Sequence, residues 1–175
     1  MRNAASISVP RVPLITPRLE LRQLRDEDAG FIVELLNDPA FLEFIGDRGV
    51  RTEVQALEYI AGQRASLKKN GFALRAVVLR STGVVTGLCG LVRRDSLPHA
   101  DVGFAFLPAY RRQGYGREAT VAVLGEAASL GIAPVLAICS PNNAGSRGLL
   151  EQVGFRFVKL TVLAGQAVES CLYER

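Results

Sequence analysis

The alternation of apolar and polar residues predicts where the first strands of this chain lie. Residues 18–24 (RLELRQL) alternate with a period of two, as a half-buried strand does. Three further strand-like segments occupy residues 72–80, 84–94 and 100–107, and the joints between them are short and contain glycine or proline. Joints of this kind indicate hairpins. We therefore expect this part of the chain to form an antiparallel sheet.

The later strand-like segments have a different pattern. Residues 134–140 (PVLAICS) are almost wholly apolar, which suits a strand buried in the middle of a sheet. Residues 155–163 and 167–175 are expected to form a last hairpin, joined by the short segment AGQ. The sequence thus predicts seven strands, of which the fifth is the most buried.

Helical spacing and end signals predict four helices. Acidic residues crowd the first turn of residues 25–38, where they suit the positive end of the helix dipole, and Pro39 is expected to stop that helix. Residues 52–71 form the second helix, which ends in two lysines and a glycine. The third and fourth helices are expected at residues 115–130 and 142–154.

The order of the predicted elements defines a fold class. The order of strands and helices fits neither repeated βαβ units nor an all-β fold. We therefore expect an α/β (α+β) fold with a mixed sheet and helices over its faces. A length of 175 residues suits one domain. We place that domain at residues 14–175, after a flexible leader at residues 1–13 that is rich in proline and polar residues.

Composition narrows the classes of function. The chain is 49% hydrophobic and 22% charged, as ordinary globular proteins are, and it contains no apolar run long enough to span a bilayer. Its start lacks the apolar stretch of a secretory signal. We therefore expect a cytoplasmic protein without a membrane partner.

The charge balance is compatible with an anionic ligand but does not require nucleic acid. There are 21 basic and 17 acidic residues, which gives a net charge of +4. No run of lysine and arginine with interleaved aromatic residues occurs, so we expect no nucleic-acid partner. Cys89, Cys139 and Cys171 lie far apart in strand-like segments, without a Cys-x-x-Cys pair or a Cys/His cluster. We therefore expect no metal site and buried, reduced thiols.

The sequence RRQGYGRE at residues 111–118 precedes the third predicted helix and resembles an anion-binding turn. The start of a helix has unpaired N–H groups and partial positive charge, which together attract anions. Gly114 and Gly116 would let a phosphate approach the backbone without a Cβ in the way. The arginines of this segment add cations that can hold phosphate oxygens.

Two other phosphate-binding motifs do not match this turn. A Walker loop requires a lysine directly after its last glycine, and neither glycine here is followed by lysine. A dinucleotide-binding motif requires a third glycine where this chain has Ala119, and it opens the first βαβ unit rather than following three antiparallel strands. On the turn alone, a plain helix entry without a ligand stays an alternative.

Three segments in order carry a resemblance to a known family. Arg111, Gly114 and Gly116 match the signature Arg/Gln-x-x-Gly-x-Gly/Ala, which lies between the fourth strand and the third helix of the GNAT superfamily of acetyl-CoA-dependent N-acetyltransferases. The segments TPRLELRQLRDEDAGFIVELLNDP and NNAGSRGLLEQVGF are similar to the branch that acetylates ribosomal-protein N-termini. The resemblance covers roughly residues 14 to 173.

This resemblance implies a particular sheet and a cofactor site. The sheet would be mostly antiparallel and seven-stranded, with helices on both faces and with its fourth and fifth strands splayed apart. Acetyl-CoA would lie in that gap, with its pyrophosphate on the turn and its pantetheine arm along the fourth strand. The implied cofactor-binding residues are Phe104, Phe106, Leu107, Arg111, Arg112, Gln113, Gly114, Tyr115, Gly116, Arg117, Asn143 and Ser146.

The implied reaction is direct attack of a primary amine on the thioester in a ternary complex. Asp101 is the candidate general base, because relatives often have a glutamate there; as an alternative, it ends a turn and faces solvent. A backbone N–H near Phe104 would stabilise the oxyanion. Many relatives use a tyrosine as the acid, but the next tyrosine after Asn143 is Tyr173, so Ser146 or a bound water is the candidate instead.

We therefore expect an acetyl-CoA-dependent N-acetyltransferase, monomeric or homodimeric, that acts on a primary amine. The branch resemblance favours a peptide N-terminus as acceptor, and a small-molecule amine stays open. Phe41, Leu42, Phe44 and Ile45 lie where relatives shape the acceptor pocket, or they pack in the core. Because the sequence gives only weak signals for the general acid and the general base, a non-catalytic acyl-CoA-binding or sensing module of the same fold is the alternative function.

Overall fold

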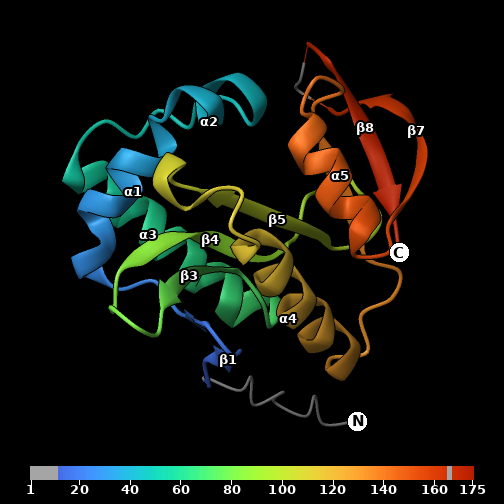
Figure 1. Cartoon of the computed structure of the whole chain (residues 1–175). Helices are drawn as coiled ribbons and strands as arrows, with labels where there is room; N and C mark the ends of the chain where they lie inside the picture. Colours follow the sequence, from blue (N-terminus) through green and yellow to red (C-terminus); the bar gives the residue numbers. More distant parts are fainter. Residues whose placement is uncertain (1–11, 165–166) are drawn as a thin grey trace, which may run out of the picture.

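Eight strands form one sheet in the computed structural model, which describes residues 12–164 and 167–175 (Figure 1). Their order across the sheet is β1-β2-β3-β4-β5-β6-β8-β7. Neighbouring strands are antiparallel except β5 and β6, which run parallel. The strands are β1 (Leu14–Ile15), β2 (Leu19–Arg22), β3 (Leu74–Leu79), β4 (Val85–Val92), β5 (Asp101–Phe106), β6 (Leu136–Cys139), β7 (Arg156–Val162) and β8 (Glu169–Glu174).

The expected mixed, mostly antiparallel sheet is confirmed, with eight strands instead of seven. The strand that the sequence missed is β1, which has two residues and pairs with β2. Two residues are too few to show an alternating pattern, so this strand is defined by its partner rather than by its own sequence. The leader predicted for residues 1–13 lies, apart from residues 12 and 13, outside the described residues.

Five α-helices and two short 3₁₀ turns occur among the described residues. They are η1 (Asp26–Asp28), α1 (Ala29–Leu36), α2 (Pro39–Phe44), α3 (Glu53–Asn70), η2 (Pro108–Tyr110), α4 (Tyr115–Ser129) and α5 (Ala144–Gln152). A search of these residues finds no helix that combines the length and the apolar content needed to cross a membrane.

The first predicted helix, residues 25–38, is divided and followed by a helix that the sequence analysis missed. After η1, α1 ends at Leu36, and Pro39 begins α2 instead of only stopping α1. Proline suits the first position of a helix, because the N–H that it lacks would have no partner there. The Asp38 side chain caps α2 by accepting a hydrogen bond from the Phe41 N–H at 3.1 Å.

Helices cover both faces of the sheet, as the resemblance implied. Successive side chains of a strand point to opposite faces, and in β3 Val77 joins one hydrophobic core while Ala76 and Val78 join the other. Residues of α4 and α5 contribute to the first core, and residues of α1 and α3 contribute to the second. Figure 1 shows α4 on one side of β4 and α3 on the other.

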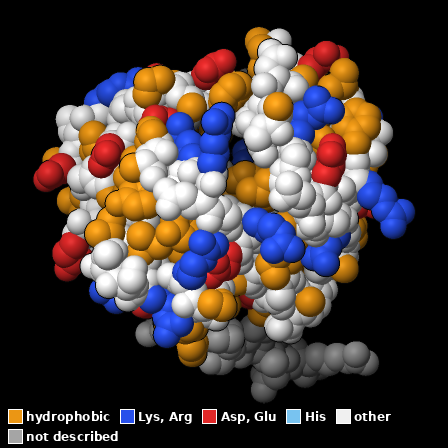
Figure 2. All heavy atoms as spheres, viewed as in Figure 1, with side chains coloured by type: hydrophobic (Ala, Val, Ile, Leu, Met, Phe, Trp, Pro, Cys, Tyr) orange, Lys and Arg blue, Asp and Glu red, His pale blue; other side chains and the backbone are white. Residues whose placement is uncertain are grey.

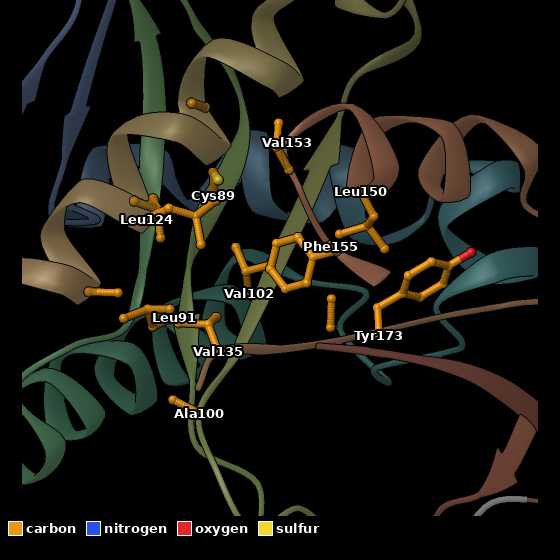
Figure 3. Packing of buried hydrophobic residues seen from close by; sticks show 14 of the residues in the cluster. Cys89, Leu91, Ala100, Val102, Leu124, Val135, Leu150, Val153, Phe155 and Tyr173 are labelled. Carbon is orange, nitrogen blue, oxygen red and sulfur yellow. The ribbon is translucent and has the colours of Figure 1, made fainter. Parts of the chain in front are cut away.

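The sheet opens between β5 and β6. A single residue pair, Asp101 with Leu136, joins the two strands, and beyond it they diverge. One core cluster holds the two halves together: Figure 3 shows the Phe155 ring among Val102 of β5, Leu150 of α5 and Tyr173 of β8. Because these side chains are buried and packed on one another, the gap has fixed walls.

Candidate active site

The turn before α4 presents a row of unpaired N–H groups. The six N–H groups from Arg112 to Arg117 donate to no protein acceptor within the described ranges, and the first paired one is that of Glu118, 3.1 Å from the Gly114 carbonyl oxygen. Arg112 and Gly114 have φ angles of 59° and 81°, in the left-handed region. Turns of this type at the start of a helix form concavities that bind anions. The turn therefore has the backbone geometry of an anion-binding turn, and anion binding by it stays a prediction.

The two glycines of the turn meet different constraints. A Cβ at Gly114 would stand on a backbone with positive φ and 3.2 Å from an Arg18 nitrogen. A Cβ at Gly116 would lie 2.8 Å from the Leu149 Cδ1 atom of α5, which is closer than such atoms approach. Gly114 therefore gives the turn its shape, whereas Gly116 also lets α4 and α5 pack together.

The arginines of the turn are not equivalent. Arg111 points inward: its Nε donates to the Phe106 carbonyl oxygen at 2.8 Å, and its Nη2 pairs with Asp38 at 2.5 Å. Its side chain thereby ties the turn to the start of α2. Arg112 and Arg117 are exposed, so their guanidinium groups lie at the surface beside the unpaired N–H groups.

Arg18, between β1 and β2, supports the turn and was missed by the sequence analysis. Its Nη1 donates to the Gln113 carbonyl oxygen at 2.9 Å, its Nε pairs with Glu118 at 2.6 Å, and its guanidinium carbon lies 4.6 Å from the centre of the Tyr115 ring. Burial opposes the charge of Glu118, but hydrogen bonds from Thr16 and Arg18 outweigh it and lower the pKa of Glu118. About a hundred residues separate these partners, so no local pattern could reveal them.

Replacing Arg18 with alanine is expected to weaken CoA binding by about three- to tenfold, because the Gln113 carbonyl would lose its charged donor. The ion pair is partly exposed, so the free energy of unfolding should fall by only about 1 kcal/mol or less. Calorimetric titration with CoA measures the first effect. Arg80→Ala is the matched control, because Arg80 donates to the carbonyl oxygens of Thr16 and Pro17 but not to the glycine turn. Equal CoA affinity in both variants would contradict the role of Arg18.

A cavity of about 300 Å³ occupies the opening between β5 and β6. Figure 2 shows a hollow near the middle of this face, with lysine or arginine side chains at its rim. Four of the predicted site residues line the cavity together: Asp101, Phe104, Asn143 and Ser146. The cavity is completed by residues of α2, α3, β4 and β6, among them Phe41, Phe44, Ile45, Tyr59, Gln63, Arg94 and Cys139.

The remaining predicted residues lie elsewhere. Phe106 and Leu107 are buried, and they belong to the cores on opposite faces of the sheet. The glycine turn forms no part of the cavity wall. Phe41, Phe44 and Ile45, for which core packing was an alternative, do line the cavity, although Phe41 also belongs to a core. The fold thus separates an anion-binding turn from a chemical cavity.

The alternative interpretation, in which Asp101 faces solvent, is wrong. Its exposed fraction is 0%, and both of its carboxylate oxygens accept hydrogen bonds from Arg94 Nε, at 3.0 and 3.1 Å. Burial raises the pKa of Asp101, and the neighbouring Arg94 guanidinium offsets only part of that effect. Asp101 is therefore a carboxylate that binds a proton more readily than usual, inside a cavity.

Three cavity residues were missed by the sequence analysis: Arg48, Tyr59 and Arg94. Arg94 could have been found, because the β4–β5 hairpin pairs Val92 with Asp101 and thereby brings the residues after Val92 close to that carboxylate. Arg48 and Tyr59 lie on separate elements without a motif. Burial raises the pKa of Tyr59, although Arg48 and Arg94 oppose this, so its hydroxyl group stays protonated.

The Tyr173 hydroxyl group and the Cys139 thiol are not candidates for the acid or the base. The Tyr173 hydroxyl group lies 3.2 Å from Arg147 Nε and 3.3 Å from a Glu151 oxygen, and Tyr173 does not line the cavity. Cys139 lines it, but burial raises the pKa of the thiol to about 11, so it stays neutral. No group of three potential metal ligands (His, Cys, Asp or Glu) occurs in the parts of the chain described by the structure.

The fold and the site together define a class of enzyme. The sheet opens at its centre, a turn with unpaired N–H groups precedes α4, and a buried carboxylate lines the opening. A family model described as an acetyltransferase (GNAT) domain matches residues 18–156. The chain belongs to the GNAT acetyltransferase family and is an acetyl-CoA-dependent N-acetyltransferase.

Individual relatives agree with this assignment. The N-acetyltransferase YnaD of Bacillus subtilis is 24% identical over 144 residues, which are 82% of each chain. An acetyltransferase structure from Agrobacterium tumefaciens has a TM-score of 0.78 and 24% identity, and the match covers 100% of this chain and 99% of that one. RimL, a ribosomal L7/L12 α-N-protein acetyltransferase solved in complex with coenzyme A, has a TM-score of 0.71 and 14% identity over 93% of this chain and 97% of its own. These structures share the fold.

Proposed function

We propose that the enzyme acetylates a primary amine in the cavity between β5 and β6, with Asp101 as the general base. The observation that carries this proposal is the position of Asp101, fully buried yet lining the cavity and held 3.0 Å from Arg94. A carboxylate in that position can take a proton from an amine that enters the cavity. Proteins do not bury an ionisable group in a cavity without a partner or a task.

The residues present fit acetyl-CoA. The unpaired N–H groups from Arg112 to Arg117 and the exposed side chains of Arg112 and Arg117 suit its phosphates. Beyond Asp101, the edge of β5 that faces β6 has no strand partner among the described residues, so an extended arm can pair with it. When bound, acetyl-CoA supplies the thioester carbonyl that an amine attacks and the thiol that departs.

The residues of the chain have distinct tasks in this proposal. Asp101 accepts the proton that an ammonium group must lose before its nitrogen can attack, and the raised pKa of Asp101 makes it a stronger base than an ordinary carboxylate. Arg94 fixes the orientation of that carboxylate. The backbone N–H near Phe104 stabilises the oxyanion, and Ser146 Oγ holds the proton that the departing sulfur takes up.

A peptide N-terminus is the acceptor that the sequence resemblance favours. RimL, which shares the fold, is a ribosomal L7/L12 α-N-protein acetyltransferase, and this supports the same choice. The wall of the cavity formed by α2 and α3 is the part that would contact the acceptor, because the opposite wall carries Asn143 and Ser146. The protein is a monomer or a homodimer in this proposal, and its three free thiols suit a cytoplasmic location.

The function is tested by measuring free CoA released from acetyl-CoA in the presence of peptides, amino acids and small amines. Mass spectrometry of the acceptor locates the acetyl group on a nitrogen. We expect release to depend on the amine and to saturate with its concentration. Binding of acetyl-CoA without release for any amine would contradict the proposal and support a binding or sensing module.

The pH dependence of the rate provides a second test. Only the ionised Asp101 can accept a proton, and burial raises its pKa. The rate at saturating substrates should therefore fall as pH decreases, with a midpoint above the ordinary aspartate value of about 3.9. The profile should lose this limb in Asp101→Asn. A limb that persists unchanged in the variant would show that another group is the base.

A further inference from the structure

The cavity holds more positive than negative charge. Its charged lining residues are Arg48, Arg94 and Asp101, two cations and one anion. Asp101 is paired through the Nε atom of Arg94 alone, which leaves the terminal nitrogens of Arg94 without an acceptor among the described residues. Arg48, in the segment between α2 and α3, likewise has no ion-pair partner in the described part of the chain. Guanidinium groups at a cavity wall suit a carboxylate ligand.

These cations do not belong to the anion site of the glycine turn. No residue of the turn, from Arg111 to Arg117, lines the cavity that contains Arg48 and Arg94. Both arginines lie close enough to Tyr59 of α3 to stabilise its negative form. Arg48 and Arg94 therefore line the cavity together with Tyr59 of α3 and with Phe41 and Phe44 of α2.

We propose that Arg48 and Arg94 bind a carboxylate that the acceptor amine itself carries, with the Tyr59 hydroxyl group as an additional donor. This inference rests on the proposed acetylation of a primary amine. An amine without an anionic group would meet two cations and leave the terminal nitrogens of Arg94 without a protein acceptor, and like charge disfavours an ammonium ion there. A carboxylate on the same molecule removes that repulsion and leaves the amine free to lose its proton.

The geometry of Arg94 limits the distance between the amine and the carboxylate. One edge of its planar guanidinium holds the Asp101 carboxylate, which accepts the amine proton, and its terminal nitrogens hold the ligand carboxylate. The amine and the carboxylate of the ligand must therefore lie near each other in the same molecule. The candidates are a free amino acid, whose carboxylate is attached to the carbon that bears the amine, and a peptide N-terminus with an acidic second residue, whose carboxylate lies several bonds further from the amine. The apolar side chains of Phe44 and Ile45 leave room for an aliphatic side chain beside them.

The test uses matched product analogues, so that binding is measured separately from turnover. The CoA-loaded protein is titrated by calorimetry with N-acetyl-leucine and N-acetyl-leucinamide, and with N-acetylated pentapeptides that begin Ala-Asp or Ala-Asn. We expect the acid of at least one pair to bind about tenfold more tightly than its amide. Preference within the leucine pair assigns a free amino acid, and preference within the peptide pair assigns a peptide N-terminus.

Arg48→Gln should reduce that preference to about threefold or less, because one of the two guanidinium groups is lost. Arg93→Gln is the matched control: Arg93 is exposed like Arg48, lies next to Arg94 in the β4–β5 connection, donates to the Pro98 carbonyl oxygen and does not line the cavity. The control should keep the full preference. Equal binding of acid and amide in both pairs, or no binding of any of the four ligands, would overturn the inference.

Turnover assays separate this inference from the function on which it rests. Leucine, leucinamide and the two unacetylated peptides are offered with acetyl-CoA, and CoA release is followed. Acid-selective binding without CoA release would reject the acetylation of these amines and keep the carboxylate site. Release that is as fast with the amides as with the acids would keep the enzyme and reject the carboxylate site.

Discussion

Asp101→Asn is expected to lower kcat by about 10²- to 10⁴-fold, which is the usual contribution of a general base. Asparagine has nearly the shape of aspartate and can still accept a hydrogen bond from Arg94, but it cannot take a proton from the amine. Acetyl-CoA affinity should change little, because the phosphate-binding turn lies outside the cavity. Steady-state kinetics with a reactive amine, together with calorimetry for CoA, measure the two effects separately.

A suitable control for this change is Asp95→Asn. Asp95 lies in the connection that leads from β4 to Asp101, the first residue of β5, and it is exposed, whereas Asp101 has an exposed fraction of 0%. The control should keep kcat and CoA affinity. If Asp101→Asn kept the full rate at every pH, a different residue or a water would be the base. If it unfolded the protein instead, the thermal unfolding curve would reveal this before the kinetics were interpreted.

Gly114→Val is expected to weaken CoA binding by about a hundredfold or more. Gly114 has a φ of 81°, which a β-branched side chain adopts only with strain, and a Cβ there would lie 3.2 Å from an Arg18 nitrogen. The turn would have to change shape, and two or more N–H bonds to a phosphate would be lost, each about 1.5–3 kcal/mol. Calorimetric titration with CoA measures the loss.

The control for backbone strain alone is Gly83→Val. Gly83 lies in the turn between β3 and β4 with a φ of 73°, and a Cβ there would meet no heavy atom within 4 Å. Both variants should lose stability to a similar degree, by about 1–2 kcal/mol or somewhat more. Only Gly114→Val should lose affinity for CoA. Comparable CoA affinity in the two variants would show that the turn does not hold the diphosphate.

The sequence predicted the sheet well wherever a local pattern carried the information. The β3, β4 and β5 strands show apolar runs separated by short turns, and they form consecutive hairpins as expected. The glycine turn was also visible, because Gly114 and Gly116 precede a helix within a few residues. By contrast, α2 has six residues and no periodic signal of its own, and it exists because Asp38 caps it and Pro39 begins it.

The candidate site was predicted only in part, because some of its residues lie far apart in the chain and belong to no motif. Asp101, Phe104, Asn143 and Ser146 were named from motifs, and the fold does bring them to one cavity. Arg48, Tyr59 and Arg94 were not named, because they come from three separate elements. Arg111 was placed at the phosphates by its motif, but its side chain contacts Asp38 and the Phe106 carbonyl oxygen.

By itself, the sequence predicted the mixed fold and the glycine turn, because strand alternation, helix ends and a glycine turn are encoded within a few consecutive residues, and its resemblance to the GNAT superfamily indicated the family. The tertiary structure alone decided that Asp101 is buried against Arg94 and that Arg48 and Arg94 line the same cavity. Burial and charge pairing depend on residues that are distant in the chain, so they arise only when the elements pack.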